Sequence, residues 1–394
     1  MQENSIGDKR IDSFIKSVSS QLKRKIIAQS VLDKVYEFDD HKIHSTASGS
    51  VNINNEGSTN ITYDGIWNSP HPKPISLAIG ESKINSREVL NFKDAYLLGS
   101  TPSILTNYKL ISPDNILSDT RKYDDSIKSI ISSYFGATVP SRHIRHAFLV
   151  SRHSDSFGHW ATEVLPKLKI FEKYNKSIDY ELNLIIGNEL NSWQKESLRL
   201  MGYDVDSIFK HKMGKSFIHD LHVPSHSHLA GYQLGRYPSP EDLRWVQRCI
   251  LNNLPETENS FGDRIYISRA DVDRRQVINK DEVMDVLHKF GFKTYVPGEM
   301  TFTDQAELFA GANIIIGPHG AGLLNTIFAN DATLIEFVIP EKTNIHFFVL
   351  ANLMRLDYEY VCSEAKSEDD VYFGHSDMNV NTEDLDNVLK KLLG

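Results

Sequence analysis

Residues 313–325 read NIIIGPHGAGLLN, and this stretch is the most informative one in the sequence. The three isoleucines predict a buried strand, the glycines predict a sharp turn, and the leucines predict a helix that continues to Phe328. Unpaired N–H groups in the first turn of a helix bind anions, and glycine lets the main chain approach a ligand closely. The stretch therefore predicts an anion site, to which His319 adds a donor. The alternative is a plain glycine turn with a capping histidine, since the spacing fits neither a Walker loop nor the dinucleotide fingerprint.

Segments that predict strands alternate with segments that predict helices around this stretch. The strands are expected at residues 264–269, 292–296, 313–316 and 333–338. Asn279 with Glu282 resembles a capping box and starts a helix that Gly291 ends, and a second helix begins with Thr303 as its N-cap. Such alternation indicates βαβ units with a parallel sheet, in which ligands bind beyond the carboxyl ends of the strands.

Charged side chains gather where these strands end. Arg269 ends the first strand, with Arg274 and Arg275 close behind it, and His319 and Glu336 lie at or near two further strand ends. Arginines and helix amides bind phosphate oxygens, while a carboxylate suits ribose hydroxyls. Each arginine taken alone is more often a solvated surface residue. The prediction of a nucleoside diphosphate site therefore rests on their convergence.

The same residues carry a resemblance to a known family. In chain order, the motifs are His159-Trp160, Glu163, Leu165-Pro166-Lys167-Leu168, Ser268-Arg269, Arg274-Arg275, Gln305, the run from Gly317 to Leu323, Asn325 and Ile335-Glu336. This combination resembles the glycosyltransferases of family sixty-one, which act in capsular polysaccharide and O-linked glycan assembly. The resemblance covers roughly residues 145 to 360, whereas residues 1–90 match nothing that we can name.

The resemblance implies a GT-B-like α/β fold, with two Rossmann-like domains facing a cleft and an extra β-rich and helical N-terminal segment. It implies an inverting transfer of a sugar from a nucleotide-diphosphate sugar to a hydroxyl of a glycan, a surface polysaccharide or a glycoconjugate, including a lipid-linked acceptor. A non-catalytic nucleotide- or glycan-binding protein is the alternative. The expected donor-binding residues are Ser268, Arg269, Arg274, Arg275, Pro318, His319, Gly320, Ala321, Gly322, Asn325 and Glu336.

His159 and Glu163 are the candidate catalytic residues. Spaced four apart, they share one face of a helix. Either residue can take the proton of an acceptor hydroxyl, and the acid can instead orient the histidine. The alternative is a structural helix start in which Gly158 forms the turn, Trp160 packs in the core, and Pro166 kinks the helix or begins a second one.

The length of the chain, 394 residues, predicts more than one domain. We expect a helical and β-rich segment at 1–145, an acceptor-side α/β domain at 146–254 and a nucleotide-sugar-binding α/β domain at 255–394. Residues 94–100 and 109–117 are expected to pair as a β-hairpin. In the middle domain we expect strands at 147–150, 182–186 and 221–224, and helices after Gly158, at 192–201 and from Ser239 to Leu254.

Composition narrows the partners and the compartment. A formal charge of -9 without a long basic run disfavours nucleic acid as a partner. Two cysteines in a chain of this length, a polar N-terminus and the absence of a long apolar run favour a cytoplasmic protein without a signal peptide. Residues 11–37 predict a helix for which two interpretations stay open: internal packing, which we favour, and peripheral contact with the inner membrane face or a partner. The oligomeric state stays open.

We expect no cofactor besides the donor substrate, and no required divalent metal. His222, His226 and His228 lie close together, but no predicted helix places two of them on one face with a nearby acid, so a solvated loop is the favoured interpretation. Asp204-Val205-Asp206 and Asp271-Val272-Asp273 resemble the Asp-x-Asp metal motif of other glycosyltransferases. The second motif follows a strand, but its neighbouring arginines would repel a cation and can neutralise a diphosphate themselves.

Overall fold

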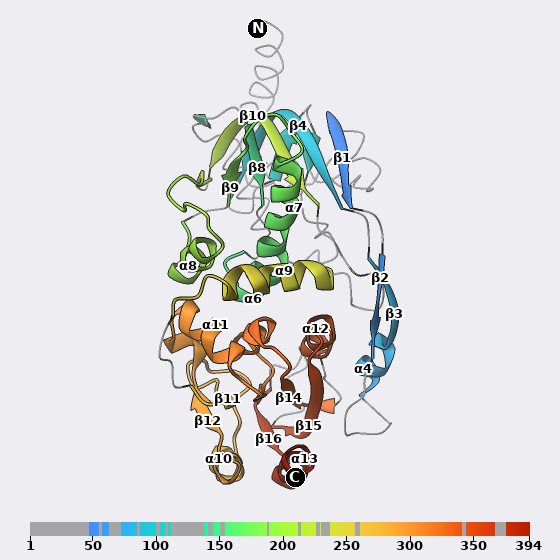
Figure 1. The fold of residues 1–394 in the computed structure, drawn as a ribbon, viewed down its shortest axis with the longest axis vertical. Helices are drawn as coiled ribbons and strands as arrows, with labels where there is room; N and C mark the ends of the chain where they lie inside the picture. The colour runs from blue at the N-terminus through green and yellow to red at the C-terminus, as the bar shows by residue number, and fades with distance from the viewer. Residues whose placement is uncertain are drawn as a thin grey trace, which may run out of the picture. The chain divides into compact units, whose positions relative to one another are not determined.

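Two compact units make up the chain, whose fold we obtained as a computed structural model (Figure 1). The first unit comprises Met1–Ser50, Leu90–His146 and His211–His222, and the second comprises Val51–Val89, Ala147–Lys210 and Val223–Gly394. The structure describes residues 47–54, 57–62, 72–84, 87–99, 103–106, 109–111, 138–140, 145–149, 154–186, 189–211, 214–225, 229, 237–256, 261–340, 344–366 and 376–394. The helix expected at 11–37 lies outside these residues, and the predicted domain boundaries stay predictions.

The first unit contains a β-sheet in which β6 (Lys109–Ile111), β5 (Ser103–Thr106), β4 (Arg87–Leu98) and β10 (Lys215–Pro224) lie in that order. β4, β5 and β6 are antiparallel neighbours. β7 (Thr138–Pro140) pairs with β10 in parallel. β8 (Arg145–Phe148) is also a neighbour of β10, and β1 (Gly49–Asn54) pairs with β4. Buried His211 is held there by Ser216 Oγ, 2.8 Å from Nδ1, and by Gly99 O, 3.0 Å from Nε2.

The hairpin predicted between residues 94–100 and 109–117 is wrong. A third strand, β5, lies between its two expected partners, and residues 112–117 lie outside the described part of the chain. β5 is only four residues long and is buried at Ser103, Ile104 and Thr106. Because both faces of this strand are largely covered, its sequence lacks the polar and apolar alternation by which a half-buried strand is recognised.

The C-terminal part of the second unit is a six-stranded sheet. Its strands lie in the order β12 (Lys293–Tyr295), β11 (Arg264–Ile267), β13 (Ile314–Pro318), β14 (Thr333–Val338), β15 (Asp357–Ala365) and β16 (Met378–Val380). All neighbours pair in parallel except β16, which is antiparallel to β15. The parallel βαβ sheet predicted from the sequence is therefore confirmed.

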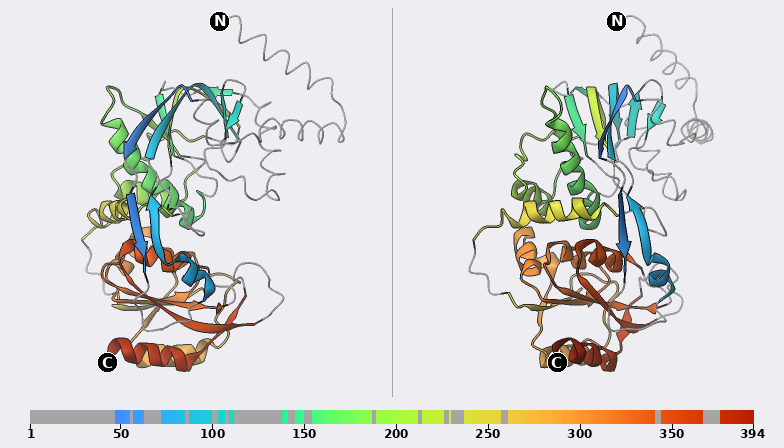
Figure 2. Two further views of the ribbon diagram at one scale, coloured as in Figure 1. Left: turned by 90° about the vertical axis from the view of Figure 1, so that its right-hand side faces the viewer. Right: turned by 45° about the vertical axis from the view of Figure 1, so that its right-hand side comes forward.

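Helices cover both faces of this sheet (Figures 1 and 2). α10 (Lys280–Lys289) and α13 (Thr382–Leu393) lie side by side on one face, where Val283, Leu385 and Ile316 belong to one buried cluster. α11 (Phe302–Ala310), α12 (His346–Met354) and the 3-10 helix η4 (Ala321–Phe328) lie on the other face. Strands buried on both faces are continuously apolar, which explains the isoleucine run of β13.

Residues 157–175 form one helical segment with an unusual turn inside it. α6 (Phe157–His159) passes into a π-helix, η2 (Trp160–Val164), and then into α7 (Leu165–Asn175). Pro166 lies in the first turn of α7, directly after the π turn, and Val164 and Leu165 before it keep right-handed helical dihedral angles. The helical segment therefore runs on through Pro166.

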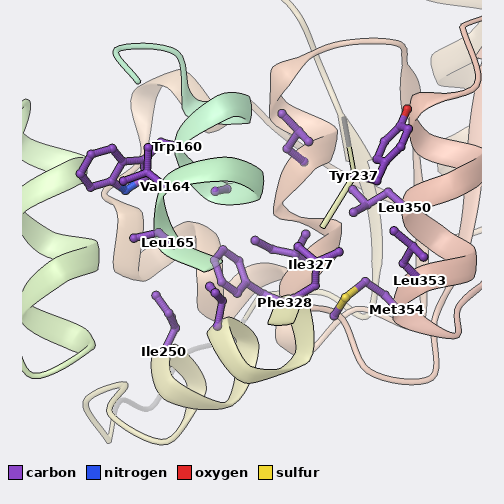
Figure 3. Packing of buried hydrophobic residues seen from close by; sticks show 14 of the residues in the cluster. Trp160, Val164, Leu165, Tyr237, Ile250, Ile327, Phe328, Leu350, Leu353 and Met354 are labelled. Carbon is purple, nitrogen blue, oxygen red and sulfur yellow. The ribbon is translucent and has the colours of Figure 1, made fainter. Parts of the chain in front are cut away.

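The rest of the second unit packs on the same core. β9 (Asn183–Ile185), α8 (Ser192–Leu200) and α9 (Pro240–Leu251) follow α7 in sequence. In Figure 3, Trp160 of η2, Ile250 of α9 and Phe328 of η4 meet in one apolar cluster with Leu350 and Met354 of α12. The remaining elements are the antiparallel pair β2 (Gly57–Ile61) and β3 (Gly80–Ile84), α4 (Lys73–Ala78) and the 3-10 turn η3 (Pro297–Glu299). None of the helices in the described part of the chain has the length and apolar composition to cross a bilayer.

Two helix starts differ from the sequence prediction. The N-cap of α11 is Thr301, whose side chain accepts from Asp304 N at 3.1 Å, and Thr303 instead donates to Glu196 of α8 at 2.6 Å. Asn279 makes no side-chain cap on α10. Its amide instead pairs with the main chain of Val380, at 2.9 Å in both directions. In both cases the side chain that was expected to cap the helix forms a hydrogen bond with a residue distant in sequence instead.

Candidate functional site

The predicted donor residues gather at the carboxyl ends of β11 and β13. These two strands are neighbours, but the chain leaves β11 toward β12 on one side and returns to β13 on the other. Such a reversal of strand order opens a crevice between the loops that follow the two strands, and ligands of open α/β sheets bind there. The loop after β11 begins at Ser268, and the loop after β13 begins at His319.

Two glycines let these loops approach each other closely. A Cβ added to Gly317 would lie 2.9 Å from the carbonyl oxygen of Ile267, and one added to Gly320 would lie 1.8 Å from Nη1 of Arg269. The guanidinium of Arg269 therefore occupies the space that a side chain at position 320 would need. The contact observed at the glycines is between the two loops, and the close approach of their main chain to a ligand stays a prediction.

The arginines after β11 bind main-chain oxygens of this crevice. Arg269 Nε donates to Arg274 O at 3.1 Å, and Arg275 Nη1 donates to His319 O at 3.3 Å. Gln276 Nε2 donates to Arg269 O at 2.7 Å and so holds the loop that carries both. Arg274 is exposed, while Arg269 and Arg275 are half-buried.

Positive charge is concentrated by this arrangement. Burial lowers the pKa of Arg269, with Asp271 opposing the shift. Burial also lowers the pKa of Arg275, and the charges of Arg269 and Arg274 lower it further against the attraction of Glu336. Guanidinium groups stay protonated in proteins, so their mutual repulsion is a free-energy cost that a bound anion would relieve.

His319 is held by a buried carboxylate. Its Nδ1 lies 2.6 Å from Oε1 of Glu336, and the Tyr358 hydroxyl donates to Oε2 of the same carboxylate at 2.7 Å. Glu336 is 1% exposed, whereas the His319 side chain is 19% exposed. The ring of Phe347 packs edge-on against that of His319, with centroids 4.8 Å apart.

Other predicted donor-binding residues are buried behind the glycine turn or lie at its ends. Asn325 is fully buried, and its Nδ2 donates to Gln305 Oε1 at 2.7 Å and to Gly322 O at 3.2 Å. Ser268 is buried and its N–H donates to Tyr295 O at 2.8 Å. Pro318 is buried at the end of β13, while Ala321 is exposed and Gly322 half-buried at the start of η4. The predicted helix after the turn is confirmed, and it is of the 3-10 type.

His159 and Glu163 form a close pair. His159 Nδ1 lies 2.5 Å from Glu163 Oε1, and the two side chains are 38% and 19% exposed. Their helix packs against η4, the 3-10 helix that follows the glycine turn, because a Cβ added to Gly158 would lie 2.7 Å from Cδ1 of Leu324. The candidate base and the turn thus belong to one packed unit.

The metal candidates are dispersed. Asp271 and Asp273 are exposed, and Asp204 Oδ1 accepts from Asp206 N at 3.1 Å within a turn. Buried His222 pairs with Asp220 at 3.2 Å, while His226 and His228 lie outside the described residues. Over the described part of the chain, no three His, Cys, Asp or Glu side chains are grouped so that they could hold a metal ion.

Three side chains of this region were missed by the sequence analysis: Gln276, Phe347 and Tyr358. Gln276 and Phe347 belong to no motif. A signal existed for Tyr358, since a carboxylate inside the apolar strand TLIEFV needs a donor, and the neighbouring strand is where one would be found.

Comparison with known families bears on the whole of this region. Residues 157–335 match the family model Glycosyltransferase 61. This segment, which is less than half of the chain, is similar to a Glycosyltransferase 61 domain. The matched segment contains both candidate catalytic residues and every predicted donor residue except Glu336, which follows its last matched position. No curated protein sequence matches the chain.

Proposed function

We propose that the protein is an inverting glycosyltransferase that moves a sugar from a nucleotide-diphosphate sugar to a hydroxyl of a glycan, surface polysaccharide or glycoconjugate. The observation that carries the proposal is the contact of Arg269 and Arg275 with the glycine turn at the carboxyl ends of β11 and β13. Half-buried guanidinium groups that repel one another favour a ligand with more than one negative charge, and a diphosphate meets this requirement.

The residues divide the reaction between them. The acceptor hydroxyl attacks the anomeric carbon as its proton passes to the His159–Glu163 pair, and the bond from that carbon to the diphosphate oxygen breaks. The departing diphosphate takes the electron pair, and Arg269, Arg275 and the amides of the turn stabilise its charge. Attack from the side opposite the diphosphate inverts the anomeric carbon. We place the acceptor on a second Rossmann-like domain of a GT-B arrangement, and the protein in the cytoplasm.

A non-catalytic nucleotide- or glycan-binding protein would share the arginine turn. The 2.5 Å pair of His159 and Glu163, on a helical segment that packs against η4, favours an enzyme, because a binding protein has no need of a proton acceptor. The two functions differ in a simple assay. An enzyme hydrolyses its bound sugar nucleotide slowly without an acceptor, whereas a binding protein only retains it.

The experiment that tests the donor site is calorimetry with a panel of free nucleoside diphosphates. Arg269→Ala should weaken binding of the tightest one by roughly 1.5 to 3 kcal/mol, the contribution of a hydrogen bond to a charged group. Arg264→Ala is the matched control, because Arg264 lies at the opposite end of β11 and donates to Phe290 O at 2.8 Å. Affinity unchanged in both Arg269→Ala and His319→Ala would refute the assignment.

A further inference from the structure

Glu336 lies where an ionised side chain is costly. Alternate residues of a strand face the same side of a sheet, so Glu336 shares its side of β14 with Leu334 and Val338, which belong to the buried apolar cluster under α12 and η4. Burying a carboxylate there is unfavourable unless its oxygens accept hydrogen bonds. Both do so, one from Tyr358 and the other from His319. The carboxylate thus directs its contacts to the histidine of the turn.

The pairing fixes which nitrogen of His319 can meet a ligand. Nδ1 is turned toward Glu336, and Nε2 is the remaining nitrogen of the ring. Among the residues that the structure describes, Nε2 has no hydrogen-bond partner, and the side chain is partly exposed. In the protonated ring both nitrogens carry hydrogen, so Nε2–H is a charged donor. The ring cannot rotate freely, since Phe347 packs against it.

We propose that Tyr358 and Glu336 are positioning residues that hold His319 as a cationic donor to the diphosphate, with Nε2–H on a phosphate oxygen. This rests on the proposed function, and it gives Glu336 a role different from the ribose contact expected from the sequence. The groups that face His319 are Glu336 on β14, Tyr358 behind it on β15, Phe347 on α12 and, at its carbonyl, Arg275. The carboxylate balances the imidazolium, and the arginines meet the rest of the ligand charge.

Inorganic pyrophosphate tests the proposal because it has phosphates but no ribose. By calorimetry at neutral pH, His319→Gln should weaken pyrophosphate binding about tenfold, and Glu336→Gln should weaken it by a similar factor. The fold should persist in Glu336→Gln, because the amide keeps the size of the side chain and an oxygen for Tyr358. The double variant should bind no more weakly than His319→Gln alone, because Glu336 acts through His319. Tyr358→Phe, which keeps the ring, should weaken pyrophosphate binding roughly threefold.

The double variant supplies a readout that packing alone would not change. Losses that multiply in it would overturn the proposal, because they would show that Glu336 acts on the ligand separately from His319. So would a loss in Glu336→Gln seen with the nucleoside diphosphate but not with pyrophosphate, which indicates a ribose contact. If pyrophosphate binding depends on Arg269 but not on Glu336, the proposed function stands and this inference is wrong. If the wild type does not bind pyrophosphate, both are wrong.

Discussion

Gly320→Ala should separate the geometry of the donor site from the stability of the fold. The added Cβ would lie 1.8 Å from Nη1 of Arg269, against an ordinary contact distance of at least 3.4 Å. The guanidinium must therefore move by about 1.6 Å or more to restore normal contact. The main chain needs no change, because φ of Gly320 is 176°, an extended value that alanine also adopts.

Gly320→Ala should change the stability of the fold much less than it changes ligand binding. The atom that must move is the far end of a flexible side chain, so the free energy of unfolding should fall by less than about 1 kcal/mol. Nucleoside diphosphate binding should weaken by roughly 10- to 100-fold, which corresponds to the 1.5 to 3 kcal/mol of a displaced charged hydrogen bond. Arg269→Ala should weaken it by the same factor.

Calorimetry and urea unfolding measure both quantities in the same variants. Gly311→Ala is the control for a glycine replacement, because its added Cβ meets only Glu307 O at 3.7 Å. Combining Gly320→Ala with Arg269→Ala should add little to either single change, since both remove the same contact. Wild-type affinity in Gly320→Ala, or losses that multiply in the double variant, would refute the reasoning.

Further predictions concern the base, the metal and the first unit. His159→Ala and Glu163→Gln should each remove most of the ~10²- to 10⁴-fold rate enhancement that a positioned base supplies, while donor affinity is retained. The double variant should lose little more than either single variant. Wild-type acceptor-dependent rates in both single variants would show that His159 and Glu163 have a structural role. Turnover should survive an excess of chelator, and a loss that manganese or magnesium restores would instead favour Asp271 and Asp273 as metal ligands. Burial lowers the pKa of His211 and of His222, so the unfolded chain takes up protons at a higher pH than the folded one. The free energy of unfolding, measured by urea titration, should therefore fall as pH drops below about 6.5, with a slope of up to about 1.4 kcal/mol per pH unit for each histidine, and His211→Gln should flatten that dependence.

The C-terminal sheet could be predicted because its signals are local. The strand expected at 333–338 is β14 with the same bounds, since five of its six residues, Leu334 to Val338, are buried and all five except Glu336 are apolar. The start of α11 could not be placed as well. Glu196, on another helix, accepts from the N–H groups of Phe302 and Thr303 at 3.0 and 3.3 Å and so captures Thr303. A contact over more than 100 residues leaves no local signal.

The candidate site shows the same division. The motifs located the turn, the arginines and the His159–Glu163 pair, whose 2.5 Å contact agrees with the expectation that four-residue spacing places both on one helix face. They did not indicate how Glu336 is used. That depends on Tyr358, which reaches it from the neighbouring strand, and on burial, which only the packed structure reveals.

The π-helix at Trp160–Val164 has a geometric consequence for this site. A π turn holds one residue more than an α turn, and one residue corresponds to a rotation of about 100° around the helix axis. Deleting a residue from this segment would therefore not simply shorten the helix. It would swing Gly158 off Leu324 and point His159 in another direction while α7 kept its place in the core. A related chain without the extra residue would have to carry the counterpart of His159, the candidate proton acceptor, at a different position along the helix.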